Sequence, residues 1–183
     1  PVNWYSTHSL TLPHDSLSQA KMSPCGRLLA FSKNSHRLEI RYAGDTSTLC
    51  ELSHSTSVQS ILWTAQSNTL LTSTNDSQIH FWSTPTGTKL GKWKDCTSPT
   101  TAMQTTPDGR FMASYHRDSS IKLWSLETKE WLFDMPLTTP LVKTFCILPM
   151  QKGAFLVTGQ IDGSIRVWDY QTGLCLSERR AHS

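Results

Sequence analysis

The sequence has no apolar run approaching the roughly 18 residues that a membrane-spanning helix needs. Charged residues are also scarce, at 17% of the chain against about 25% in typical soluble domains. The lysines and arginines are scattered and the net charge of +3 is mild, so charge alone does not indicate nucleic-acid binding. We therefore expect no membrane partner, and the many threonines and branched residues favour a β-rich chain.

Metal and disulfide motifs are missing as well. The five cysteines form an odd set with no CxxC pair and no histidine at zinc-finger spacing. We predict reduced, mostly structural thiols in a reducing compartment, the cytoplasm, with the nucleus as the alternative. The sequence also contains no HExxH pair and no glycine-rich loop before a helical stretch, so we predict no metal and no cofactor.

One four-residue motif recurs in the sequence. It reads Ile79-His80-Phe81-Trp82, then Ile121-Lys122-Leu123-Trp124, then Ile165-Arg166-Val167-Trp168. The three tryptophans fall 42 and 44 residues apart, and an aspartate stands six positions before each of them. Such spacing indicates an array of one repeated unit, in which each unit buries its apolar face against its neighbours.

Each unit contains short β-like runs separated by turn residues. In the third unit, runs at 101–105 and 111–115 flank the turn Pro107-Asp108-Gly109-Arg110, and a last run at 131–135 follows the tryptophan motif. Alternating apolar residues and Gly, Asn or Pro at the turns are typical of small antiparallel sheets. Because helical periodicity is absent at useful length, we predict an all-β chain with four strands in each unit.

The most regular copy is Gly159-Gln160-Ile161-Asp162-Gly163-Ser164-Ile165-Arg166-Val167-Trp168-Asp169, and it resembles a WD repeat. That family forms β-propellers of four-stranded blades, so the resemblance implies four complete blades from a larger propeller of about seven, with a self-contained four-bladed ring as the alternative. The expected divisions are the last strand of a preceding blade at 1–14, blade 1 at 15–54, blade 2 at 55–97, blade 3 at 98–138, and blade 4 with the start of a next repeat at 139–183.

The first unit departs from the pattern. Arg41 stands where the tryptophan belongs, and Ser35 stands where the aspartate belongs. We expect this blade to lack part of the internal bonding of the others and to be the least rigid.

The resemblance also implies a buried polar tetrad of Trp, Ser or Thr, Asp and His in each blade. A buried indole N–H needs an acceptor, and a linked set of polar groups supplies one. The corresponding residues are His54, Thr72, Asp76 and Trp82 in the second unit, Ser114, Asp118 and Trp124 in the third, and Thr158, Asp162 and Trp168 in the fourth. The third and fourth units show no clear histidine, because Ser98-Pro99 and Thr139-Pro140 stand at its place.

The same residue types allow a different hypothesis. His54, Asp76 and a hydroxyl residue could form a hydrolase triad, since a nucleophile, a base and an orienting carboxylate are its parts. The set recurs in every regular unit, however, as a scaffold bond does and a single active site does not. We therefore predict no catalytic residues and no enzyme. We also expect His80 and Lys122 to be exposed, because they alternate with the apolar residues of their strands.

Binding residues concentrate on loops that a rigid scaffold carries. In the family, the face beside the tetrad aspartates is a common docking surface. The residues just before those aspartate positions are Asn34, Asn75, Arg117 and Ile161, with His116 beside Arg117. Arg117 is the strongest candidate, because its planar cation can pair with carboxylates or stack on aromatic rings. For Trp93 and Trp131 we expect packing between blades, with an exposed side patch as the alternative.

The function that this resemblance implies is a non-catalytic protein–protein interaction scaffold, the propeller portion of a larger multidomain or complex-forming protein. Its partners would be proteins or peptides, together with the remaining blades of the same parent chain. The alternative is an RNA-associated propeller of a ribonucleoprotein complex. Its electrostatic contacts would be Lys89, Lys92, Lys94, Arg179 and Arg180.

Overall fold

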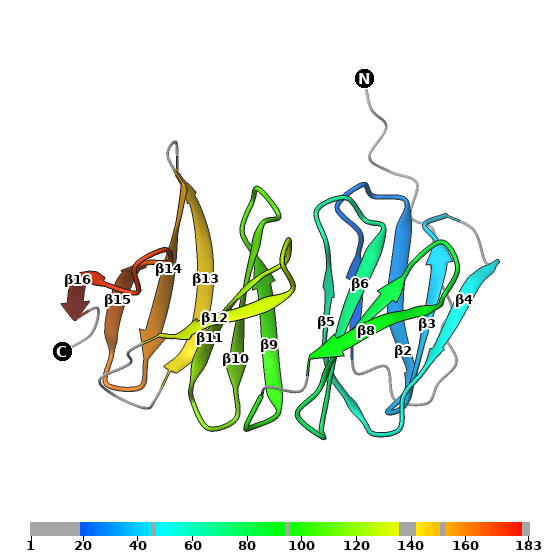
Figure 1. Ribbon diagram of the computed structural model, residues 1–183, viewed down its shortest axis with the longest axis horizontal. Coiled ribbons are helices and arrows are strands. Elements are labelled where there is room, and N and C mark those ends of the chain that lie inside the picture. Colours follow the sequence, from blue (N-terminus) through cyan, green and yellow to red (C-terminus); the bar gives the residue numbers. More distant parts are fainter. Residues whose placement is uncertain (1–18, 45–46, 94–95, 136–141, 151–152, 181–183) are drawn as a thin grey trace.

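A computed structural model describes residues 19–44, 47–93, 96–135, 142–150 and 153–180. Every regular element in these residues is a β-strand. The described part of the chain accordingly offers no helix suited to crossing a membrane. Figure 1 shows four separate sheets standing in a row, in the same order as they occur in the sequence. The predicted all-β fold with four four-stranded units is therefore confirmed.

Each sheet is an antiparallel meander of four consecutive strands. The first sheet contains β1 (Ala20–Met22), β2 (Leu28–Asn34), β3 (Arg37–Tyr42) and β4 (Thr48–Ser53). The second contains β5 (Val58–Trp63), β6 (Thr69–Thr74), β7 (Ile79–Ser83) and β8 (Lys89–Trp93). The third contains β9 (Thr100–Thr105), β10 (Phe111–His116), β11 (Ile121–Ser125) and β12 (Glu130–Asp134). The fourth contains β13 (Val142–Met150), β14 (Gly153–Gln160), β15 (Ser164–Asp169) and β16 (Cys175–Arg180).

Two expectations about the chain ends fall partly outside this description. The strand expected within residues 1–14 lies outside the described residues, as do residues 181–183 at the end of the last expected division. The description ends at Arg180, the last residue of β16.

The hydrophobic core is divided among the three interfaces between successive sheets. Alternation along the third strand of each sheet explains why, because neighbouring residues point to opposite faces. In β7, Ile79 and Phe81 pack toward the third sheet, whereas Trp82 packs toward the first. Trp124 and Trp168 likewise pack against the sheet that precedes their own. The regularly spaced tryptophans therefore lie in equivalent surroundings.

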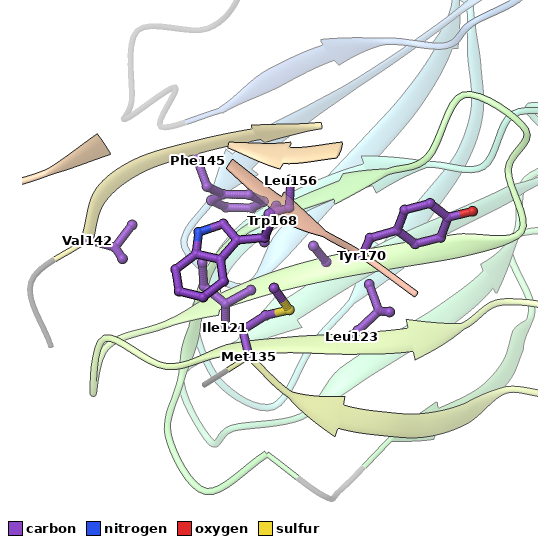
Figure 2. Packing of buried hydrophobic residues seen from close by; sticks show 9 residues of the cluster. Ile121, Leu123, Met135, Val142, Phe145, Leu156, Trp168 and Tyr170 are labelled. Carbon is purple, nitrogen blue, oxygen red and sulfur yellow. The ribbon is translucent and has the colours of Figure 1, made fainter. Parts of the chain in front are cut away.

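The interface between the third and fourth sheets is shown in Figure 2. Ile121 and Leu123 of β11 face Trp168 of β15 and Leu156 of β14, and all four side chains are at most 2% exposed. Ile165 holds the position in the fourth sheet that Ile121 holds in the third, yet it is 42% exposed. This difference arises because no described sheet follows the fourth.

The two tryptophans of the fourth strands have different environments. Trp93 is buried, and its ring stacks on Trp124 with the ring centres 4.5 Å apart, so it packs between sheets as expected. Trp131 is 48% exposed at the outer edge of its sheet, where its Nε1 donates to Asp134 at 3.0 Å. For Trp131 the expectation of packing between blades was wrong, because by strand register it occupies the exposed position of Lys89, whereas Met135 occupies the buried position of Trp93.

The turn between the second and third strands contains a left-handed residue in three sheets. Ser77, Ser119 and Gly163 occupy equivalent positions and have φ values of 63°, 67° and 79°. Glycine adopts this conformation without a steric penalty, whereas the Cβ of serine is crowded there. Two of these turns therefore contain a residue that is not the most favourable one for the backbone.

We predict that Ser77→Gly stabilises the protein by up to about 1 kcal/mol, because it removes the Cβ strain of a left-handed residue. Urea denaturation measures the change, and Ser77→Ala is the matched control because it keeps the Cβ. If Ser77→Gly lowered the unfolding midpoint below that of Ser77→Ala, the strain argument would be wrong.

Candidate functional site

A buried hydrogen bond joins the second and third strands in three sheets. The Nε1 of Trp82 donates to Thr72 Oγ1 at 2.9 Å, that of Trp124 to Ser114 Oγ at 2.7 Å, and that of Trp168 to Thr158 Oγ1 at 2.9 Å. In each case the two residues are ten positions apart in the sequence and both are buried. The bond satisfies the indole N–H inside the interface and ties the hairpin together.

A histidine extends this bond in the second and third sheets. His54 Nε2 lies 2.8 Å from Thr72 Oγ1, and His116 Nε2 lies 2.8 Å from Ser114 Oγ. Each hydroxyl accepts the indole N–H and donates its own hydrogen to Nε2, because the neutral ring carries its proton on Nδ1, which faces a backbone oxygen that can only accept. That nitrogen lies 3.3 Å from the backbone oxygen of His36 in the case of His54, and 2.9 Å from that of Ser98 in the case of His116.

Our prediction that His116 contributes to a docking surface was wrong. Its side chain is completely buried, because it lies two residues after Ser114 on the same strand and points to the same face. It fills the place that His54 fills in the second sheet from the end of β4. The third sheet therefore contains a histidine bonded to its buried hydroxyl, although Ser98-Pro99 stand where the sequence pattern places one. A search of the strand itself, two residues beyond the hydroxyl, would have found it.

The turn aspartates form local bonds. Asp118 Oδ1 accepts the backbone N–H of Ser120 at 3.0 Å and its hydroxyl at 2.6 Å, and Asp162 Oδ1 accepts the same pair from Ser164 at 2.8 and 2.6 Å. The serine hydroxyl and N–H lower the pKa of the Asp162 carboxyl, so this exposed turn keeps its negative charge.

In this arrangement the aspartates do not complete the expected tetrad. Asp76 instead accepts from Thr74 Oγ1 at 2.5 Å. Among the described residues no hydrogen bond joins Asp76 to His54 or Asp118 to His116. The buried bonds thus link tryptophan, hydroxyl and histidine, and the aspartates shape the turns.

The first sheet replaces the indole bond with a different contact. By strand register, Phe31 stands where Thr72 and Ser114 stand, and Arg41 stands where the tryptophans stand. The guanidinium carbon of Arg41 lies 5.1 Å from the centre of the Phe31 ring, a cation–π geometry. Arg41 Nε also donates to Glu39 Oε1. The sheet therefore lacks the indole bond, as expected from its sequence.

Four ionisable side chains occupy one equivalent position on the third strands. Glu39, His80, Lys122 and Arg166 are between 1% and 6% exposed. Lys122 Nζ contacts both carboxylate oxygens of Asp134, at 2.7 and 3.0 Å, and Arg166 Nη2 donates to Glu178 at 3.0 Å. Our expectation that His80 and Lys122 are exposed was wrong. The strand face opposite the apolar residues meets the preceding sheet rather than water.

The remaining candidates lie on exposed turns at one end of the sheets. Asn75 and Arg117 come from successive sheets, and Arg117 Nη2 lies 3.5 Å from Asn75 Oδ1. Ile161 is 53% exposed on the equivalent turn of the fourth sheet. Asn34 is also exposed, but its Oδ1 accepts the N–H groups of His36 and Arg37, both at 2.9 Å, and so shapes its own turn. We call Asn34, Asn75, Arg117 and Ile161 the turn face.

The geometry does not support a hydrolase triad in the second sheet. Thr72 is completely buried, and its hydroxyl is already engaged by Trp82 and His54. A nucleophile must reach substrate, whereas this oxygen lies inside an interface. Within the described residues there is also no group of three or more His, Cys, Asp or Glu side chains that could hold a metal ion.

The basic residues considered for RNA do not form one patch. Lys89 and Lys92 lie on β8 of the second sheet, whereas Arg179 and Arg180 lie on β16 of the fourth. Lys92 Nζ donates to Gln78 at 2.7 Å, and Lys89 lies 5.6 Å from the Trp82 ring centre. Lys94 lies outside the described residues.

Comparison with known proteins agrees with this geometry. The family described as "WD domain, G-beta repeat" matches residues 46–83, 87–125 and 140–169, which together are more than half of the chain. The protein belongs to the WD40 repeat family. Its four sheets are accordingly WD-type propeller blades. Proteins of this family generally serve as non-catalytic interaction scaffolds.

Several curated proteins are similar to this chain at low sequence identity. The COMPASS component SWD3 of Saccharomyces cerevisiae is 25% identical over 159 residues, which cover 86% of this chain and 50% of that protein. The pre-mRNA-splicing factor cwf17 of Schizosaccharomyces pombe is 23% identical over 126 residues, which cover 68% of this chain and 36% of that protein. Periodic tryptophan protein 2 of Arabidopsis thaliana is 24% identical over 170 residues, which cover 91% of this chain and 19% of that protein. The chain spans half or less of the length of these relatives.

We predict that His116→Ala destabilises the protein by about 1–3 kcal/mol, because it leaves the Ser114 hydroxyl and the Ser98 carbonyl without their buried partner. His54→Ala should have a similar effect in the second blade. Chemical denaturation measures both changes. Arg117→Ala, next to His116 but exposed, is the matched control and should change stability by less than about 0.5 kcal/mol. Unchanged stability in His116→Ala would contradict the buried assignment.

Acid should destabilise the fold before the carboxylates titrate. Burial lowers the pKa of His54 and of His80 to about 4, and it also lowers the pKa of His116. Imidazoles in the unfolded chain take up protons near pH 6.5, whereas those of folded His54 and His80 stay neutral until about pH 4. Stability is therefore complete above pH 6.5 and decreases as the pH falls toward 4, by roughly 1–3 kcal/mol. Urea midpoints across this range measure the loss, and His80→Gln should reduce its slope. A constant midpoint between pH 7 and 4.5 would contradict this account.

Proposed function

We propose that this chain is a non-catalytic interaction scaffold that binds protein or peptide partners through its turn face. The observation that carries the proposal is the meeting of Arg117 and Asn75 on exposed turns of successive blades, 42 residues apart in the sequence. A binding site assembled from two blades exists only when the blades are correctly stacked. Packing of Trp124 against the second blade supports that order, and its indole bond to Ser114 keeps the buried N–H satisfied.

The chemistry of the turn face suits a polar or acidic partner segment with one apolar contact. Arg117 offers a guanidinium whose one contact to Asn75, at 3.5 Å, is long and easily exchanged. Asn75 supplies an amide that can both donate and accept. Ile161, on a turn one blade further, supplies an exposed apolar side chain. A segment lying across these turns would meet the three groups in sequence.

The wider setting of the protein belongs to the same proposal. We place the chain in a larger multidomain or complex-forming protein of the cytoplasm or nucleus, with further blades of the parent chain as its immediate neighbours. Two relatives support a complex-forming role, since their names describe a COMPASS component and a pre-mRNA-splicing factor. The second name also favours the nuclear alternative.

That relative likewise favours the second candidate function, an RNA-associated propeller of a ribonucleoprotein complex. In such a complex the basic residues of β8 and β16 would contact RNA phosphates. Their separation onto the second and fourth blades weighs against a single direct RNA contact. Salt dependence distinguishes the two candidates, because phosphate contacts release counterions and weaken steeply as salt rises.

We predict that Arg117→Glu weakens capture of specific partners from a cell lysate by about tenfold or more, as expected when an interface arginine is reversed in charge. Quantitative mass spectrometry of proteins captured by the wild type and the variant measures the effect. Arg179→Glu, on β16 and away from the turn face, is the matched control. The complexes should survive moderate salt and ribonuclease. Identical capture by wild type and Arg117→Glu, or loss of every partner with ribonuclease, would contradict the proposal.

A further inference from the structure

At the ends of the sheets opposite the turn face, two cavities lie on either side of one turn. A cavity of about 310 Å³ lies between the first and second blades, and one of about 470 Å³ lies between the second and third. Gln66 and Asn68, on the turn between β5 and β6, line both of them. We call the two cavities together the paired cavities.

The turn that divides them is fixed by hydrogen bonds to its neighbours. Ser67 is buried in a left-handed conformation with φ of 59°, and its hydroxyl accepts the backbone N–H of Cys25 from the first blade at 3.2 Å. Its carbonyl oxygen accepts the Thr84 hydroxyl at 2.9 Å. On the other side, a Cβ added to Gly109 would lie 2.8 Å from the Cβ of Ala65, so the second and third blades approach closely there. The walls are therefore preformed, as is usual for binding pockets.

The smaller cavity is suited to an apolar side chain. Leu28, Leu49 and Pro85 contribute apolar walls, and Tyr42 adds an aromatic ring that is 47% exposed. The larger cavity also has apolar surface, from Phe81 and from Leu90, which is 52% exposed. Exposed apolar groups in a preformed hollow favour burial by a partner.

The charges around the paired cavities are unequal. Asp108 is engaged by the Thr106 hydroxyl and by the backbone N–H of Arg110, and Glu127 lies 3.7 Å from the Arg110 guanidinium. Arg27 and Lys129 remain without a salt bridge to any described residue. Arg27 lines the smaller cavity, and Lys129 lines the larger one. Counted over both cavities, the three cations Arg27, Arg110 and Lys129 face the two carboxylates of Asp108 and Glu127. The excess positive charge belongs to the smaller cavity, where Arg27 has no acidic residue in the lining, and it favours an acidic partner there.

We propose that the paired cavities form a second docking surface, distinct from the turn face, which binds an extended acidic peptide with one apolar side chain in the smaller cavity. Arg27 and Lys129 hold acidic residues on either side of the anchor. The dividing turn runs beneath the peptide backbone, and the exposed amide groups of Gln66 and Asn68 face it as hydrogen-bonding partners. Because each cavity lies between two blades, the peptide would contact three successive blades.

A short capped synthetic peptide with glutamates around a central leucine tests this directly on the whole chain. We expect saturable binding by fluorescence anisotropy, about tenfold tighter than for the same peptide with lysines in place of the glutamates. Replacing the leucine by alanine should weaken binding by a similar factor. Failure of the acidic peptide to bind, or equal binding of the lysine peptide, would overturn the proposal.

Variants locate the site. Lys129→Glu and Arg27→Glu change exposed side chains and should each weaken the acidic peptide about tenfold. Arg117→Glu, on the turn face, is the matched control and should leave peptide affinity unchanged. This control also separates the two proposals, because loss of peptide binding at the paired cavities and loss of partner binding at the turn face are measured with different variants. Binding that is insensitive to both charge reversals, or that is lost in Arg117→Glu, would overturn the assignment.

Alkylation of cysteine provides a second readout at the smaller cavity. Cys25 is exposed at its rim, and hydrogen bonds, chiefly with the Ser23 hydroxyl, lower its pKa to about 7, so it reacts readily near neutral pH. Bound peptide should slow alkylation of Cys25 severalfold while leaving Cys175, an exposed thiol on β16, unaffected. Equal alkylation of Cys25 with and without peptide would overturn placement of the anchor in this cavity.

Discussion

The structure depends on the need to satisfy an indole N–H inside an interface. A tryptophan buries more apolar surface than any other side chain, but its N–H loses its water when the sheets stack. The hydroxyl on the neighbouring strand accepts a hydrogen bond from that N–H, and the pair is compatible with one register of the hairpin. Burial and hydrogen bonding are thus achieved at the same residue. In the second interface Trp124 also stacks on Trp93, which adds aromatic contact to the same site.

Much of this could be read from the sequence, since tryptophan spacing and strand alternation predict the four sheets and the positions of Trp82, Trp124 and Trp168. The burial of His80 and Lys122 could not be predicted from the sequence. Alternation separates two faces of a strand, but it does not say whether the second face meets water or another sheet. His116 was missed for a related reason, because the family pattern directs attention to the end of the preceding strand. Its own strand supplies the same ring from two residues beyond the hydroxyl.

The paired cavities were beyond sequence reasoning altogether. They arise where turns of separate blades meet, and that meeting depends on the rotation of each sheet against the next. The sequence shows Gln66, Ser67 and Asn68 as an ordinary turn. Only the structure shows that Ser67 reaches the first blade through Cys25 and that Ala65 lies against Gly109. The first blade illustrates the same limit, because Phe31 and Arg41 fill the space of a hydroxyl and a tryptophan with a different interaction.

Among the described residues, each of the three hydrophobic clusters lies between two successive sheets, and this has an energetic consequence. In the described part of the chain four sheets share three cores, so each sheet stacked onto the row contributes one complete core, whereas loss of an inner sheet would expose two. The free energy of unfolding is then approximately the sum of the stability of each sheet and of the interfaces between neighbouring sheets. Lengthening by duplication of a whole unit is thermodynamically simple, because the new sheet meets a neighbour that already carries the matching surface.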